Sequence, residues 1–146
     1  MTARYFVDTN VLVYARDSSE PDKQRLASQW LRALWQNRNG CLSFQVLKEY
    51  YLVVTQRLSQ GMTAEEARAD IRDLLAWEPV VMDTAVLENA WLAQDRFRFS
   101  WWDALIVAAA QRAGCRYLLT EDLQNGQNLD GVTVLNPFEV RPESMA

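Results

Sequence analysis

Histidine is absent from this chain of 146 residues. Its absence excludes the most common general base, the Ser-His-Asp arrangement and the usual ligand sets of zinc sites. The only two cysteines, Cys41 and Cys115, are too few and too scattered for a disulfide framework, so we expect buried free thiols. Any chemistry must therefore use carboxylates, hydroxyls and hard metal ions.

Long apolar runs and an excess of basic residues are also missing. The longest apolar stretch, residues 104–110, is far too short to span a membrane. The first residues lead directly into a strand-like run without the pattern of a secretory signal, which together with free thiols favours a cytoplasmic protein. The formal net charge of −4 argues against a broad electrostatic grip on nucleic acid. A nuclease is still compatible with it, because clustered carboxylates lower the net charge and bound cations reverse its sign locally.

The length and the apolar fraction of 49% fit one globular domain over 1–146, with a core at about 4–138 and a short C-terminal tail. Strand-like segments occur at 4–7, 41–43, 79–82, 117–120 and 132–135, and helical patterns at about 21–39, 44–58, 63–76, 84–97 and 100–113. Residues 8–10 form a turn, and 122–130 form a polar loop. This alternation predicts an α/β domain with a central, mostly parallel sheet of four to five short strands flanked by helices. The two helices between the second and third strand-like segments form an inserted helical hairpin.

Four acids stand in otherwise apolar surroundings: Asp8, Glu49, Asp103 and Asp122. A buried carboxylate is costly unless it is paired or binds a cation, and no Lys or Arg accompanies each of these acids locally. Asp8 and Asp122 follow strands, while Glu49 and Asp103 lie near the starts of helices. All four positions belong to the carboxyl edge of a parallel sheet, where ligands bind in open α/β folds. The sequence therefore predicts a shared site for Mg²⁺ or Mn²⁺, which prefer oxygen ligands.

Each acid alone also has a purely structural interpretation. Asp8 can cap the segment that follows it, and Asp103 can be the acid of a capping box that begins at Ser100. Glu49 can face solvent, and Asp122 can be a turn residue. The joint placement of the four at one predicted edge favours the metal site over four unrelated roles.

Polar neighbours of the acids can orient carboxylates or water molecules. These neighbours are Thr9, Asn10, Ser100 and Thr120. For Ser100 and Thr120, helix capping and strand-end hydrogen bonding are the alternative roles.

The motifs around the acids resemble those of PIN domains, specifically the VapC-like toxins of toxin–antitoxin pairs. The resemblance covers nearly the whole chain and rests on four fragments: Phe6-Val-Asp-Thr-Asn10, Ser43 to Glu49, Ser100-Trp-Trp-Asp103 and Leu118 to Asp122. It implies that Asp8, Glu49, Asp103 and Asp122 are the catalytic, metal-binding acids of an Mg²⁺- or Mn²⁺-dependent endoribonuclease. It also implies a small inhibitory antitoxin as partner and a homodimer.

Glu121 is an alternative to Asp122 as the fourth acid, although strand alternation points the two side chains to opposite sides. Arg96 and Arg98, interleaved with phenylalanines, are candidates for RNA binding or are solvated residues at a helix end. Of the six tryptophans we expect most in the core and one or two at an interface.

Two other functions remain compatible with these residues. A non-catalytic binding scaffold on the same fold predicts no metal binding. A metal-dependent phosphohydrolase acting on DNA or on another phosphoester predicts a different substrate preference.

Overall fold

The computed structural model of the chain describes residues 3–145, and its centre is a five-stranded sheet with the order β2-β1-β3-β5-β4. Its strands are β1 (Tyr5–Val7), β2 (Gly40–Cys41), β3 (Tyr117–Leu119), β4 (Asn128–Leu129) and β5 (Val132–Leu135). All neighbouring pairs are parallel except β4 and β5. The predicted fold class, a mostly parallel α/β sheet, is confirmed.

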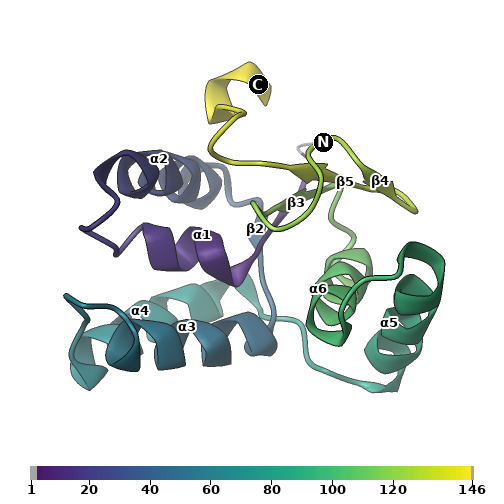
Figure 1. Cartoon of the computed structure of the whole chain (residues 1–146), viewed down its shortest axis with the longest axis horizontal. Helices are drawn as coiled ribbons and strands as arrows, with labels where there is room; N and C mark the ends of the chain where they lie inside the picture. Colours follow the sequence, from purple (N-terminus) through teal and green to yellow (C-terminus); the bar gives the residue numbers. More distant parts are fainter. Residues whose placement is uncertain (1–2, 146) are drawn as a thin grey trace.

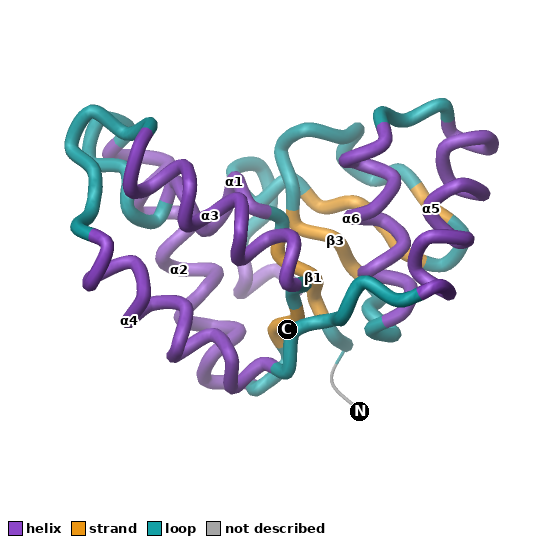
Figure 2. The backbone as a smooth tube through the Cα atoms, turned by 90° about the horizontal axis from the view of Figure 1, so that it is seen from below, coloured by secondary structure: helices purple, strands orange, loops and turns teal. Residues whose placement is uncertain are grey.

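Outside the sheet, the described residues form six α-helices and two short 3₁₀ segments. The α-helices are α1 (Thr9–Tyr14), α2 (Pro21–Asn37), α3 (Phe44–Gln56), α4 (Ala64–Leu74), α5 (Thr84–Phe97) and α6 (Trp101–Arg112), and the 3₁₀ segments are Leu75–Trp77 and Pro142–Met145. Helices α1 to α4 group on one side of the strands and the α5–α6 pair on the other (Figures 1 and 2). The expected inserted hairpin is the α3–α4 pair.

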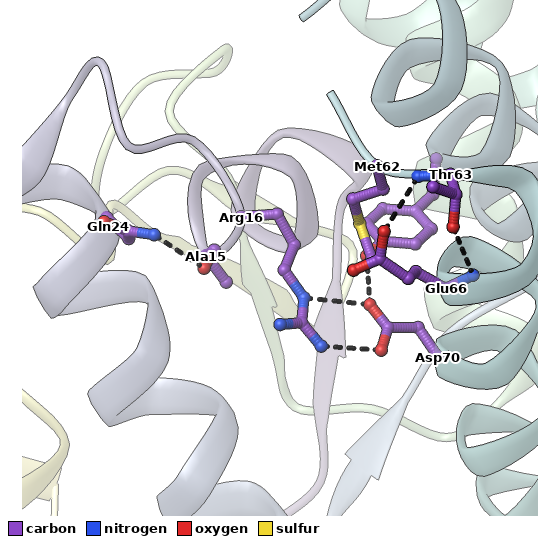
Figure 3. Close-up of polar contacts among 8 residues, drawn as sticks. Ala15, Arg16, Gln24, Met62, Thr63, Glu66 and Asp70 are labelled. Atoms are coloured by element: carbon purple, nitrogen blue, oxygen red, sulfur yellow. Dashed lines mark hydrogen bonds and ion pairs between the residues drawn. The ribbon is translucent and has the colours of Figure 1, made fainter. Parts of the chain in front are cut away.

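Side-chain caps start the helices where the sequence predicts them. The Ser43 hydroxyl accepts from the backbone of Val46 at the start of α3, and Thr63 and Glu66 form the reciprocal capping box of α4. Arg16, just after α1, makes a bidentate ion pair with Asp70 of α4, with Nε–Oδ2 and Nη2–Oδ1 distances of 2.9 and 2.6 Å (Figure 3). This pair fixes the hairpin against α1.

Three local predictions are wrong. Residues 79–82 do not form a strand: Val80 makes a single parallel bridge with Ser43, and Val81 then turns out to solvent. The polar loop 122–130 contains β4, and the turn expected at 8–10 is limited to Asp8, the N-cap of α1, whose helix begins at Thr9. The Val80 bridge depends on Ser43, a distant residue, whereas β4 and α1 are local elements of only two and six residues, too short to give a clear periodic pattern.

The core lies between the sheet and both helical groups and includes Trp30, whose indole Nε1 donates to the carbonyl oxygens of Pro137 and Val140. Trp35, Trp91 and Trp102 are exposed, so the expectation that most tryptophans are buried is wrong. Both cysteines are buried free thiols, as predicted. Every helix within residues 3–145 is too short or too polar to pass through a lipid bilayer.

Candidate active site

Asp8 lies at the carboxyl end of β1 and is nearly buried, with 6% of its surface exposed. Its backbone N–H donates to Leu119 of the neighbouring strand β3, which fixes its position beside Thr120. The Asp8 carboxylate caps α1 by accepting from the Thr9 N–H at 2.7 Å, and it accepts from the Thr120 hydroxyl at 2.8 Å. Asp8 is therefore a helix cap, and it also faces the end of β3.

Asp122 is tied to Asp8 through two polar side chains. The Asn10 amide Nδ2 donates to Asp122 Oδ2 at 3.0 Å and to Thr120 Oγ1 at 3.1 Å. The backbone N–H of Asp122 donates to the same Thr120 hydroxyl oxygen at 3.1 Å. Thr120 and Asn10 thus hold the two acids that follow β1 and β3 at one edge of the sheet.

Glu49 reaches the same edge from the second turn of α3. Its Oε2 accepts from the Thr9 hydroxyl at 2.8 Å, and its Oε1 accepts from Gln45 Nε2 at 3.1 Å. Glu49 therefore points toward the Asp8 segment and does not tip out to solvent. Sequence reasoning missed Gln45 as a site residue, although its position one helical turn before Glu49 is the signal that identifies such a contact.

Asp103 lies in the first turn of α6, whose N-cap is Ser100. The Ser100 hydroxyl accepts from the Asp103 backbone N–H at 3.2 Å. Burial raises the pKa of Asp103 above its usual range, the Ser100 hydroxyl lowers it, and the charges of Asp122 and Glu49 raise it further. Among residues 3–145 the Asp103 side chain shares no hydrogen bond with the other three acids, and the position of α6 before β3 places the start of this helix at the same edge of the sheet.

The four acids form an electrostatically uncompensated group. Burial raises the pKa of Asp8 to about 7; hydrogen bonds from Thr120 and Thr9 lower it, and the charges of Asp122 and Glu49 add to the upward shift. Within residues 3–145, none of the four acids makes an ion pair with Lys or Arg. The site is therefore a group of carboxylates without a direct Lys or Arg partner among the described residues.

The donor set suits a hard divalent cation. All the available groups are carboxylate, hydroxyl and amide oxygens, and the buried Asn10 Oδ1 has no hydrogen-bond partner among the described residues. No three Asp, Glu, His or Cys side chains in the described range lie close enough together to be ligands of one ion as they stand. Thr9, Asn10 and Thr120 instead occupy the carboxylates with hydrogen bonds, so cation binding requires side-chain rotation at these residues.

Glu121 takes a different role from Asp122. Its Oε2 lies 2.8 Å from Lys23 Nζ, and this lysine also sits over the rings of Tyr14 and Phe138. This ion pair holds Glu121 away from Asn10. The Asn10 amide instead donates a hydrogen bond to Asp122. The contacts therefore favour Asp122 over Glu121 as the fourth acid.

The two candidate RNA-binding arginines have structural contacts at the end of α5. Arg96 makes an ion pair with Asp130 at 3.2 Å, and its guanidinium lies over the Phe97 ring. Arg98 ends the helix in the left-handed conformation, with φ of 59°. RNA binding by these arginines stays a prediction.

Three solved structures share the fold of this chain at low sequence identity. A chain of the "Toxin-antitoxin complex from Klebsiella pneumoniae" is 19% identical, with a TM-score of 0.60 and coverage of 93% of this chain and 99% of that chain. A chain of the DNA-bound VapBC from Salmonella typhimurium is 15% identical, with a TM-score of 0.62 and coverage of 91% and 97%. A chain of FitAcB from Neisseria gonorrhoeae is 18% identical, with a TM-score of 0.64 and coverage of 93% and 99%. At these identities the likeness establishes the fold.

Among curated proteins, none matches this sequence. The family pattern described as "PIN domain" matches residues 5–125, which include β1, β3 and all four acids. The chain belongs to the PIN domain family.

Proposed function

We propose that this protein is a metal-dependent endoribonuclease and the toxin of a VapBC-type toxin–antitoxin pair. The single observation that carries the proposal is the group of four acids at one edge of the sheet, without a compensating Lys or Arg in the described range. Proteins with PIN domains are generally nucleases, which fits such a site. In this proposal Asp8, Glu49, Asp103 and Asp122 hold the cation.

A bound Mg²⁺ or Mn²⁺ supplies neutralisation of the scissile phosphate and activation of water. The side chains of this protein then have separate tasks. The Asp8 and Asp103 carboxylates, whose pKa values burial raises, would hold the cation in their ionised forms. Thr9 positions Glu49, and Asn10 positions Asp122, through the hydrogen bonds that link them. The burial of Asp8 limits access of bulk water to this end of the cluster.

The proposal includes an antitoxin partner. One of the similar structures is named a toxin–antitoxin complex and another a VapBC, and the three matches cover 91–93% of this chain. A negative, uncompensated acid cluster would attract a basic side chain of an inhibitor, which would compete with the cation for the carboxylates. The homodimer implied by the resemblance is kept as a prediction.

RNA cleavage assays test the proposal directly. Purified protein with Mn²⁺ or Mg²⁺ should cleave single-stranded RNA, and Asp103→Asn should reduce the rate by at least 100-fold, in the range that loss of electrostatic stabilisation produces, about 10²–10³. Asp95→Asn, on the neighbouring helix α5, is a matched control that should cleave at the wild-type rate. Equal cleavage by wild type and Asp103→Asn would refute the site. Preferential hydrolysis of DNA or of a model phosphoester would refute the choice of substrate.

A further inference from the structure

A pocket of about 520 Å³ lies at the edge of the sheet opposite the acid cluster. It is lined by Arg4, which directly precedes β1, and by Gly40, the first residue of β2, whereas Asp8 follows the last residue of β1. The ends of α2 and of the 3₁₀ segment Leu75–Trp77 form its other walls. We call it the amino-edge pocket, and its volume is within the range of small-molecule sites, about 300–1,000 Å³.

Two tryptophans form the aromatic wall of the amino-edge pocket. Gly40 allows Trp77 to lie against the backbone of β2, because a Cβ atom at residue 40 would come within 2.5 Å of the Trp77 ring. Trp35 lies beside Trp77, with 5.8 Å between the ring centroids and 37° between the ring planes. Trp35 is nevertheless 48% exposed. The supported Trp77 ring therefore holds a second indole that still has open surface, and flat ring systems such as nucleobases stack on such a surface.

Two charged residues of the pocket have an unfavourable backbone conformation. Arg38 and Glu78 have φ of 54° and 52°, and they end α2 and the 3₁₀ segment, respectively. Helices most often end in this left-handed conformation at Gly, because a side chain is strained there. Among residues 3–145, two of the four non-glycine residues with positive φ line this one pocket, and strained residues cluster at ligand-binding sites. Long charged side chains therefore stand here in place of the glycine that the backbone favours.

The charged side chains of the pocket do not neutralise one another. Arg4, Arg38 and Glu78 make no ion pair among residues 3–145, although all three line the same pocket. The Arg4 guanidinium donates from Nη1 to the Ala113 carbonyl oxygen at 2.8 Å, which fixes this side chain while its other N–H groups can bind a ligand. The pocket therefore offers guanidinium donors for an anion and a carboxylate that can only accept hydrogen bonds.

A guanine nucleotide matches the aromatic wall, the donors and the acceptor together. Its ring system can stack on Trp35, and its phosphate can take the charge-assisted hydrogen bonds that guanidinium groups form with phosphate. The Watson–Crick edge of guanine carries two adjacent donors, N1–H and the N2 amino group, which one carboxylate accepts together. Adenine presents one amino donor beside an acceptor nitrogen, and this acceptor would face the Glu78 carboxylate without a hydrogen bond.

We propose that the amino-edge pocket binds a guanine mononucleotide. The base stacks on Trp35 and donates its hydrogen bonds to Glu78, and the phosphate contacts Arg4 and Arg38. The site is separate from the acid cluster and needs no metal ion. A free nucleotide is chosen over an RNA chain because the pocket lies at the edge of the sheet away from the acids.

Isothermal titration calorimetry of the whole chain with guanosine 5′-monophosphate tests this assignment. EDTA is present, so that no metal ion at the acid cluster can hold the phosphate. Guanosine monophosphate should bind saturably, and adenosine monophosphate and unphosphorylated guanosine should each bind roughly 10-fold more weakly, as loss of a hydrogen bond to a charged group produces. Absence of saturable binding at millimolar nucleotide, or equal affinity for the two monophosphates, would overturn the proposal.

The position of the bound base is tested at Trp35. Trp35→Ala should weaken the binding of guanosine monophosphate by roughly 10-fold, as loss of one stacked base does, while Trp35→Phe should retain most of the affinity. Trp91→Ala, at a tryptophan that is 52% exposed on α5 and does not line the pocket, is the matched control and should bind normally. Unchanged affinity of Trp35→Ala would show that the nucleotide binds elsewhere.

Two further variants separate recognition of the base from recognition of the phosphate. Glu78→Gln should weaken the binding of guanosine monophosphate by roughly 10-fold and reduce its preference over adenosine monophosphate, because the Gln amide can donate to adenine. Arg38→Gln should weaken the binding of the monophosphate and leave the weaker binding of guanosine unchanged. Arg32→Gln, at an exposed residue of α2 outside the pocket, should change neither affinity. A Glu78→Gln protein with the full preference for guanine would refute the assigned base contact.

A short RNA that begins with 5′-phosphorylated guanosine distinguishes a free nucleotide from the end of an RNA chain. In EDTA it should bind no more tightly than guanosine monophosphate. Tighter binding that Trp35→Ala weakens would assign the pocket to RNA and overturn the choice of a free nucleotide. Cleavage at the acid cluster is measured separately with Mn²⁺ or Mg²⁺, so failure of nucleotide binding and failure of the proposed nuclease remain distinguishable.

Discussion

Replacement of Asp8 by Asn should change the stability of the metal-free protein in opposite directions at low and high pH. Burial raises the pKa of Asp8 from 3.8 to about 7 in the folded state. Between these two pH values the folded protein retains a proton that the unfolded chain has lost, so its free energy of unfolding falls as pH rises, by about 1.4 kcal/mol per pH unit. The buried charge therefore costs the metal-free protein about 4 kcal/mol above pH 7, and this cost is absent below pH 4.

The Asn side chain removes this cost and replaces one acceptor oxygen by an amide donor. In the wild type, the Asp8 carboxylate accepts hydrogen bonds from the Thr9 N–H and from the Thr120 hydroxyl. The single side-chain oxygen of Asn can keep only one of these hydrogen bonds. Loss of the other costs about 1–2 kcal/mol. Asp8→Asn should therefore be more stable than wild type by about 2 kcal/mol at pH 8 and less stable by about 1 kcal/mol at pH 4.5.

Urea unfolding followed by tryptophan fluorescence, in EDTA at both pH values, measures this difference. Asp22→Asn, at a side chain that is 94% exposed, is the control and should follow wild type at both values. Addition of Mn²⁺ at pH 8 should stabilise wild type and leave Asp8→Asn nearly unchanged, since a ligand stabilises only the state that binds it. A stability difference between Asp8→Asn and wild type that is the same at pH 4.5 and pH 8 would refute the buried, uncompensated charge.

Three further substitutions test the assigned contacts. Asp122→Asn should abolish RNA cleavage, whereas Glu121→Gln should cleave at close to the wild-type rate because its partner is Lys23; equal losses in a gel-based assay would contradict this assignment. Asp70→Asn should lower the free energy of unfolding by about 1–3 kcal/mol in urea titrations, because it breaks the ion pair to Arg16 and weakens the acceptor of the Tyr50 hydroxyl; an unchanged midpoint would show that the pair contributes nothing. Ser100→Ala should cost about 1 kcal/mol through loss of the α6 cap, and Ser100→Thr should restore most of it.

Much of the fold was predictable from local signals. Ser43, Thr63 and Ser100 each supply a hydroxyl to the first turn of a helix, and the helices start where these residues predict. The alternation of strands and helices was sufficient to place Asp8 and Asp122 at one edge of the sheet. The strand predicted at 79–82 is reduced to one bridge from Val80, whose partner Ser43 is far away in the chain, and β4 escaped prediction because it has only two residues.

The site was predictable in composition but not in its contacts. Asp122 and Glu121 have different partners, Asn10 and Lys23, although both lie in a bend after β3 and not in a strand, so alternation along a strand is not the cause. The bond from Thr9 to Glu49 joins residues that are 40 positions apart, and nothing in either local sequence indicates it. The exposure of Trp102 was equally hidden, since composition alone cannot distinguish a core tryptophan from one in a groove.

Diffraction from crystals grown with Mn²⁺, collected at wavelengths on both sides of the manganese absorption edge, is the most direct test of the cation site. An anomalous peak bounded by the carboxylates of Asp8, Asp103 and Asp122 or Glu49 is the predicted result, with the bonds from Thr120 to Asp8 and from Asn10 to Asp122 rearranged. Crystals with manganese elsewhere, or with none, and with these hydrogen bonds intact would contradict a metal-dependent site at this edge of the sheet.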